Sequence, residues 1–94
     1  TMANEVGVRS IPDLKQFGND LKKLSEQLQT AFHTTEHKMH RVCEGWNDRV
    51  NQKFMTEFPN DVKKIDEIAS RMSEFSKFIA KCVEILERYQ NNRL

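Results

Sequence analysis

Apolar side chains recur every three or four residues over two long stretches of this 94-residue chain. This spacing is typical of amphipathic helices that pack along a shared seam. The chain holds only 3 glycines and 2 prolines, which is too few turn residues for a many-stranded sandwich or barrel. A parallel α/β fold also needs continuous Val/Ile strands, and the sequence has none. The pattern therefore predicts an all-α fold, an antiparallel hairpin of two long helices.

The first helix is predicted to begin at Ser10, because Ser10, Pro12 and Asp13 form a pattern typical of helix starts. Residues 1–9 have no helical period, and we expect them to be a flexible N-terminus. Gly18 lies inside this helix. It is either an exposed glycine, tolerated at a cost of about 1 kcal/mol relative to Ala, or a point of close helix–helix approach. The apolar seam of this helix comprises Leu14, Phe17, Leu21, Leu24, Leu28, Ala31, Thr35, Met39 and Val42.

The turn between the helices is predicted at residues 44–48, within a single hairpin domain over residues 10–92. Gly45 suits the left-handed residue that ends a helix, and Asn47 or Asp48 can cap the next one. Pro59 disfavours helix, and we expect it to kink or break the second helix. A true turn there, giving three helices, is the competing interpretation. The second seam comprises Val50, Phe54, Phe58, Val62, Ile65, Ile68, Met72, Phe75, Ile79, Cys82, Leu86 and Tyr89.

A further set of apolar residues lies beside the two seams and includes Phe32, Met55, Phe78, Val83 and Ile85. A two-helix hairpin cannot bury them all, so we expect it to pair into a four-helix bundle, as a homodimer or as a heterodimer with another hairpin or a larger protein. We expect Leu21, Leu24, Leu28 and Phe32 to pack against Phe75, Ile79, Cys82 and Leu86. The predicted helix-pairing residues are Leu21, Leu24, Leu28, Phe32, Ile68, Met72, Phe75, Ile79 and Leu86.

The sequence argues against several other classes of function. The net charge is +1 and no basic block is present, so nucleic acid binding is not expected. No apolar run exceeds three residues, so we expect neither a transmembrane helix nor a signal-peptide core. No catalytic or phosphate-binding motif occurs, so we expect no enzyme activity and no cofactor. Cys43 and Cys82 would lie too far apart in a hairpin for a disulfide.

Three histidines, His33, His37 and His40, share one face of the first helix beside Glu36. Imidazoles at this spacing can bind Zn²⁺ or Ni²⁺. A solvated polar face is the favoured interpretation, because the histidines lie away from the seam, and we predict no metal site. A pH-sensitive contact surface is a further alternative.

The turn residues Trp46, Asn47 and Asp48 stand in mid-chain between the two seams, and Phe54 follows the Trp by eight positions. This arrangement resembles the WXG-type, ESAT-like family, the small helical hairpins of bacterial type VII secretion. The resemblance covers residues 11–89 and implies that Gly45, Trp46, Asn47, Asp48 and Phe54 form a partner-binding turn. Asp48 occupies the place of the family's Gly.

The resemblance implies a protein–protein interaction component of type VII-like secretion. The chain would then be cytoplasmic before export by that route, as a secreted partner or as an export adaptor for another protein. The family's export signal has an acidic residue four positions after a Tyr, whereas Arg93 follows Tyr89 here, which argues against autonomous export. The alternatives from the residues alone are a coiled-coil dimerisation or assembly module and a metal-binding helical protein.

Overall fold

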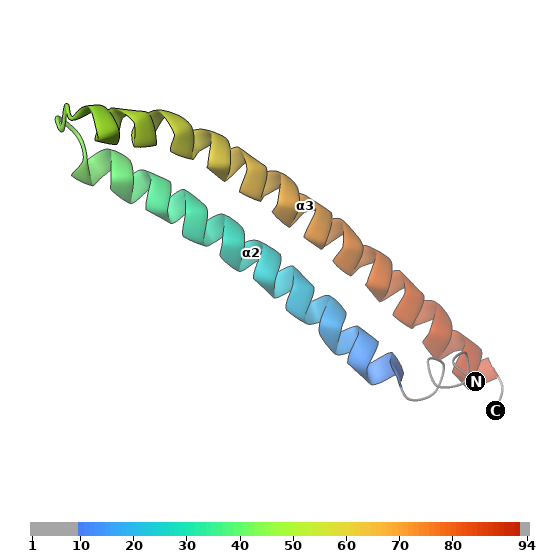
Figure 1. The fold of residues 1–94 in the computed structure, drawn as a ribbon. Helices are drawn as coiled ribbons and strands as arrows, with labels where there is room; N and C mark the ends of the chain where they lie inside the picture. The colour runs from blue at the N-terminus through green and yellow to red at the C-terminus, as the bar shows by residue number, and fades with distance from the viewer. Residues whose placement is uncertain (1–9, 93–94) are drawn as a thin grey trace. The chain divides into compact units, whose positions relative to one another are not determined.

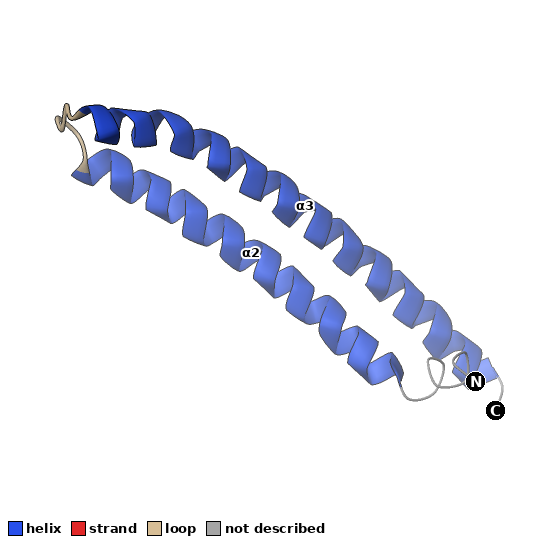
Figure 2. Cartoon of the chain, in the orientation of Figure 1, coloured by secondary structure: helices blue, strands red, loops and turns tan. Residues whose placement is uncertain are grey.

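A computed structural model of the chain describes residues 10–92, which form two α-helices joined by one loop (Figures 1 and 2). Helix α2 spans Ser10–Val42 and helix α3 spans Arg49–Asn92. The loop comprises residues 43–48. The two helices run antiparallel, so the predicted all-α helical hairpin is confirmed. The predicted flexible residues 1–9, and Arg93, lie outside the described residues.

The described residues divide into two compact units. The terminal unit combines residues 10–23 of α2 with residues 71–92 of α3. The turn unit comprises residues 24–70 and contains the loop. Each unit therefore holds a segment of both helices and has its own apolar contacts.

The core of the terminal unit is formed by Ile11, Ile79 and Val83, which are buried; partly buried Leu14, Leu21 and Leu86 pack against them. Gly18 is also buried, and a Cβ atom added to it would lie 2.9 Å from Cγ2 of Ile79. The buried Ser76 hydroxyl donates a hydrogen bond of 2.7 Å to the carbonyl oxygen of Gly18. The glycine therefore marks a close approach of the two helices, and its interpretation as a tolerated exposed residue is wrong.

The turn unit is held by aromatic stacking and by small buried residues. The Phe58 ring stacks on Phe32, with centroids 6.1 Å apart, and on Phe54, with centroids 5.7 Å apart. Val62 and Ala69 are almost completely buried. The stacked rings connect α2 to α3 at a position closer to the loop than Val62 and Ala69.

Pro59 lies inside α3, which runs unbroken from Arg49 to Asn92. The predicted break there is wrong, and so is the three-helix alternative. An internal proline removes one backbone hydrogen bond and costs about 3 kcal/mol. Tertiary packing on both sides offsets this cost, because Phe58 stacks on α2 and Val62 is buried.

The buried strip of each helix differs from the predicted seam. Gly18 and Ser25, seven residues apart on α2, are buried, as are Ala69 and Ser76 on α3. A seven-residue spacing keeps side chains on one side of a helix, so small residues share the buried positions of both helices with Ile11, Val62, Ile79 and Val83. Other residues of the predicted seams are exposed instead: Phe17, Leu24, Ala31, Thr35, Val42, Val50, Phe54, Ile68, Phe75 and Tyr89.

Candidate functional site

The loop that carries Trp46 is a tight, hydrogen-bonded turn. The amide of Trp46 donates to the carbonyl oxygen of Cys43 at 3.1 Å. Gly45 has a φ of 82°, in the left-handed region that glycine enters without steric cost. The sequence assigned this role to Gly45, and the structure gives the backbone angle that requires it.

Asp48 caps the beginning of α3. Its Oδ1 atom accepts hydrogen bonds from the amides of Val50 at 2.7 Å and Asn51 at 3.2 Å. Of the two predicted capping candidates, Asp48 therefore has the cap geometry. The Asn51 side chain donates to the carbonyl oxygen of Trp46 at 3.0 Å, which ties the Trp backbone to the first turn of α3. The Asp that stands where the ESAT-like family has Gly thus has a structural role of its own.

Four exposed apolar residues lie in the loop and in the helix ends that flank it, at every fourth position of the sequence. They are Val42, Trp46, Val50 and Phe54, and Trp46 is 58% exposed. A Trp side chain presents a large apolar area with one N–H donor, a combination enriched at protein interfaces. Of the predicted turn residues, Gly45, Asn47 and Asp48 are also exposed. The loop and the flanking helix ends therefore present apolar side chains on a hydrogen-bonded backbone.

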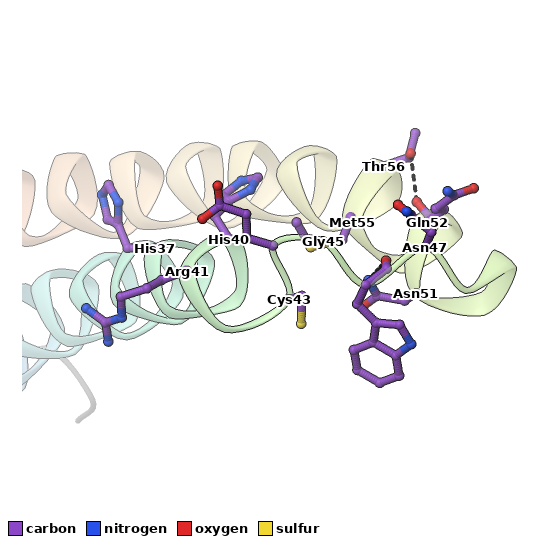
Figure 3. A pocket seen from close by; sticks show the side chains of 12 residues that line it. His37, His40, Arg41, Cys43, Gly45, Asn47, Asn51, Gln52, Met55 and Thr56 are labelled. Carbon is purple, nitrogen blue, oxygen red and sulfur yellow. Dashed lines mark hydrogen bonds between the residues drawn. The ribbon is translucent and has the colours of Figure 1, made fainter.

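Beside Trp46 lies an open hollow of about 830 Å³. Figure 3 shows His37, His40 and Arg41 extending from α2, and Gln52 and Thr56 from α3. The Thr56 hydroxyl donates to the carbonyl oxygen of Gln52 at 2.8 Å, so it is already engaged. The remaining lining side chains offer both hydrogen-bond donors and acceptors on a broad, solvent-open surface. Such a surface suits contact with a protein partner better than enclosure of a small ligand. The complete lining consists of His37, His40, Arg41, Cys43, Glu44, Gly45, Trp46, Asn47, Asn51, Gln52, Met55 and Thr56.

A second apolar surface lies on the terminal unit, and we define it as the outer apolar face: Phe17, Phe75, Phe78 and Ile85. The Phe17 and Phe75 rings meet edge to face, with centroids 6.4 Å apart, and Phe75 stacks on Phe78 at 6.3 Å. These contacts join the exposed strips of α2 and α3 into one surface. Each of the four side chains is about half exposed or more.

The predicted helix-pairing residues fall into two groups. The first group is half-buried or buried and comprises Leu21, Leu28, Phe32, Met72, Ile79 and Leu86; the second group is exposed and comprises Leu24, Ile68 and Phe75. Leu21 shares a cluster with Ile79 and Leu86. Phe32 packs on Phe58 in the turn unit, so its expected contact with residues 75–86 is wrong. The short loop sets this register, because Phe32 and Phe58 lie about equally far from it.

The histidine face contains one contact that the sequence did not indicate. Nε2 of His33 lies 2.9 and 3.0 Å from the two carboxylate oxygens of Asp66 on α3. The Gln29 side chain donates to the same carboxylate at 3.5 Å. His33 is therefore part of a cross-helix polar cluster and not of a purely solvated face. The signal in the sequence is the four-residue spacing of Gln29 and His33, which becomes informative only once the helix register is known.

Within the described residues, no group of three or more His, Cys, Asp or Glu side chains is placed to hold a metal ion. Cys43 and Cys82 are free thiols, each half-buried. Neither helix of residues 10–92 has a stretch apolar and long enough to cross a membrane.

Comparison of the chain with models of known protein families, with curated proteins and with solved structures found no match. The resemblance to ESAT-like hairpins thus depends on the residues already quoted, and the functional argument depends on the two exposed surfaces.

Proposed function

We propose that this chain is a protein-binding helical hairpin that acts as a secreted partner or export adaptor in a type VII-like secretion route. The observation that carries the proposal is the outer apolar face, which the hairpin leaves exposed although its helices are otherwise amphipathic. Sequence resemblance supplies the secretion context. The turn supplies a second contact surface around Trp46.

The outer apolar face can supply much of the free energy of association with a partner. A fully buried aromatic side chain removes 150–250 Å² from water, so four side chains about half exposed present about 400 Å². At about 25 cal/mol per Å², covering this area is worth about 10 kcal/mol before the costs of association are subtracted. Those costs are about 4–15 kcal/mol. The estimate favours binding to another apolar helix surface, which would bury a matching area of its own.

The Trp46 turn is suited to docking because its backbone is fixed before a partner arrives. Asp48 and Asn51 hold the backbone on either side of the exposed indole. Ordering costs on binding are then small, and a rigid exposed Trp is a frequent hot-spot residue. We expect Trp46→Ala to reduce partner binding or export at least tenfold while lowering the unfolding temperature little.

The comparison variant is Val50→Ala, which truncates a smaller exposed apolar side chain in the first turn of α3 and should have a smaller effect on binding than Trp46→Ala. If Trp46→Ala binds and is exported normally but unfolds earlier, then Trp46 is only a structural cap of the turn.

The secretion role is tested in the source cells by deleting the gene of this chain and comparing the secreted proteins with and without an active type VII ATPase. The proposal expects at least one secreted protein, or the chain itself, to depend on both genes. Because Arg93 replaces the acidic residue of the export signal, we expect the chain to leave the cell only together with a partner. Secretion that is unchanged by either deletion would refute the role.

A second candidate is a coiled-coil assembly module unrelated to secretion. The geometry of Asp48 favours it, since an ordinary helix cap explains the turn without any specialised motif. An assembly module would keep its function in the Trp46→Ala variant and lose it when the outer apolar face is disrupted.

A further inference from the structure

A groove of about 380 Å³ lies between α2 and α3 in the terminal unit. It exists because small residues line it: Gly18 has no side chain, and Ser76 and Ala80 have short ones. Buried Ile79 and Val83 also line the groove, so its floor is largely apolar. A segment of chain that lies in the groove would therefore place apolar side chains against this floor.

The rims of the groove carry charges of both signs. Glu84 and Arg88 both line it on α3, and they pair with each other. Lys15 on α2 and Glu87 on α3 are exposed, and neither has an ion pair within residues 10–92. An occupant that carries one acid and one base would complement both of these charges.

The groove begins beside the N-terminal end of α2. Gly18 lies against Ile79, and the two helices are antiparallel. Ser10, eight residues before Gly18, is therefore level with Glu87, eight residues after Ile79. Residues 1–9, which lie outside the described residues, join α2 at this level. They are thus attached at one end of the groove, and this attachment removes the translational cost of binding.

The sequence of the attached segment fits such a groove. In residues 5–9, Glu-Val-Gly-Val-Arg, apolar Val6 and Val8 alternate with charged Glu5 and Arg9. An extended chain directs alternate side chains to opposite sides. Both valines can then face the apolar floor while both charged side chains extend to the rims.

We propose that residues 5–9 fold back over the N-terminal end of α2 and occupy this groove in an extended conformation. Arg9, which directly precedes α2, is then level with Glu87. Glu5 lies about 13 Å further along the groove, at about 3.3 Å per residue, within reach of the long Lys15 side chain. The docked segment holds the first turn of α2 against the last turns of α3.

This inference goes beyond the proposed function and does not depend on it. Phe78, in the outer apolar face, is two residues from Ala80, a rotation of about 200° around the helix axis. The groove therefore opens on the other side of α3 from that face. For residues 5–9 the proposal replaces the expectation of a flexible N-terminus, because a period of two accounts equally for the missing helical period.

The first test is disulfide trapping in the full chain, after Cys43→Ser and Cys82→Ser remove the two native thiols. Val6→Cys and Ala80→Cys together place two thiols at the groove, and we expect mild oxidation to join them within one chain. The matched control combines Val6→Cys with Phe78→Cys, an exposed position on the other side of α3. We expect the control pair to form its disulfide about tenfold more slowly.

Equal rates for the two thiol pairs would mean that the segment visits both sides of α3 alike, and they would overturn the proposal. A disulfide that joins two chains, identified by mass under non-reducing conditions, would also overturn it, because the occupant would then be the segment of a second copy. Neither result affects the secretion assay, so this proposal and the proposed function fail separately.

The second test measures protection of the Arg9–Ser10 peptide bond, which is the first trypsin site of the chain. Docking shields this bond. Val6→Asp opposes docking, because a carboxylate against an apolar floor is unfavourable, and we expect cleavage to become about fivefold faster. Ala3→Asp adds the same charge outside the docked segment and should leave the rate unchanged. An unchanged rate in Val6→Asp would contradict the proposal, and neither substitution lies in a helix whose unfolding could imitate the result.

The third test concerns the register of the segment in the groove. In the Val6→Cys and Ala80→Cys chain, Arg9→Gln and Glu87→Gln should each slow trapping about threefold, and the double substitution should slow it no further. If the two losses multiply instead, Arg9 does not pair with Glu87, and the proposed register is refuted.

Discussion

Replacing Gly18 with alanine has two opposite effects on stability: it improves helix propensity and it worsens the packing between the helices. Alanine is about 1 kcal/mol better than glycine inside a helix. The added Cβ would, however, lie 2.9 Å from Cγ2 and 3.4 Å from Cβ of Ile79, which is only 3% exposed. A β-branched side chain cannot swing its Cγ2 methyl away, so the helices must separate, at a cost of about 1–3 kcal/mol. We expect a net loss of about 1 kcal/mol, which lowers the unfolding temperature by about 4–8 °C in a domain of this size.

Thermal and urea unfolding of Gly18→Ala measure this loss at a fixed protein concentration. Asn19→Gly and Asn19→Ala supply the matched control, because they give the glycine–alanine difference at the adjacent exposed position. Ile79→Leu moves the branch from Cβ to Cγ and removes the methyl that clashes. In that background we expect Gly18→Ala to be neutral or stabilising. If Gly18→Ala alone stabilises the chain as much as the exposed control does, the close approach does not constrain this position.

Three further changes test the turn, the proline and the polar cluster. Asp48→Ala removes the cap from two amides of α3 and should lower the free energy of unfolding by about 1 kcal/mol, whereas Asp48→Asn should retain most of it. Pro59→Ala restores a backbone donor inside α3 and should stabilise the chain by about 1–3 kcal/mol in urea unfolding; no gain would mean that this segment does not need the hydrogen bond. His33→Ala and Asp66→Ala, measured singly and together, should show a coupling below about 1 kcal/mol, since the side chains are 47% and 36% exposed.

The ends of the helices could be predicted from the sequence because they depend on local chemistry. Gly45 enters the left-handed region and Asp48 accepts from the first amides of α3, and both roles involve only neighbouring residues. Pro59 is the exception, because its local preference against helix is outweighed by contacts of Phe58 with α2 that no local pattern contains. Local signals therefore identify termini well, and they mislead where packing across the hairpin is strong.

The facing surfaces of the two helices could not be predicted in the same way. Hydropathy assigns Phe17 and Leu24 to the seam, yet they are 50% and 48% exposed, whereas Gly18 and Ser25 are buried. Apolar periodicity identifies the side chains whose removal from water is favourable in free energy. The position of closest approach between two helices is set by volume, and small residues allow the backbones to come together. The choice between neighbouring strips therefore depends on side-chain size on both helices at once.

The same reasoning explains why the candidate surfaces could be predicted only in part from the sequence. The apolar stripe of each helix is wider than one neighbouring helix can cover, so half of it packs inside the hairpin and the rest remains exposed. On α3, Ile79 belongs to the buried half, while Phe75 and Phe78 belong to the exposed half. Periodicity places Phe75 and Ile79 in one seam, with Phe78 beside it, and gives no means of deciding which of the two seam residues is buried. The division is consistent with the position of Gly18, because Ile79 lies against this glycine in the space that a side chain would otherwise fill, whereas Phe75 and Phe78 lie on the exposed side of α3.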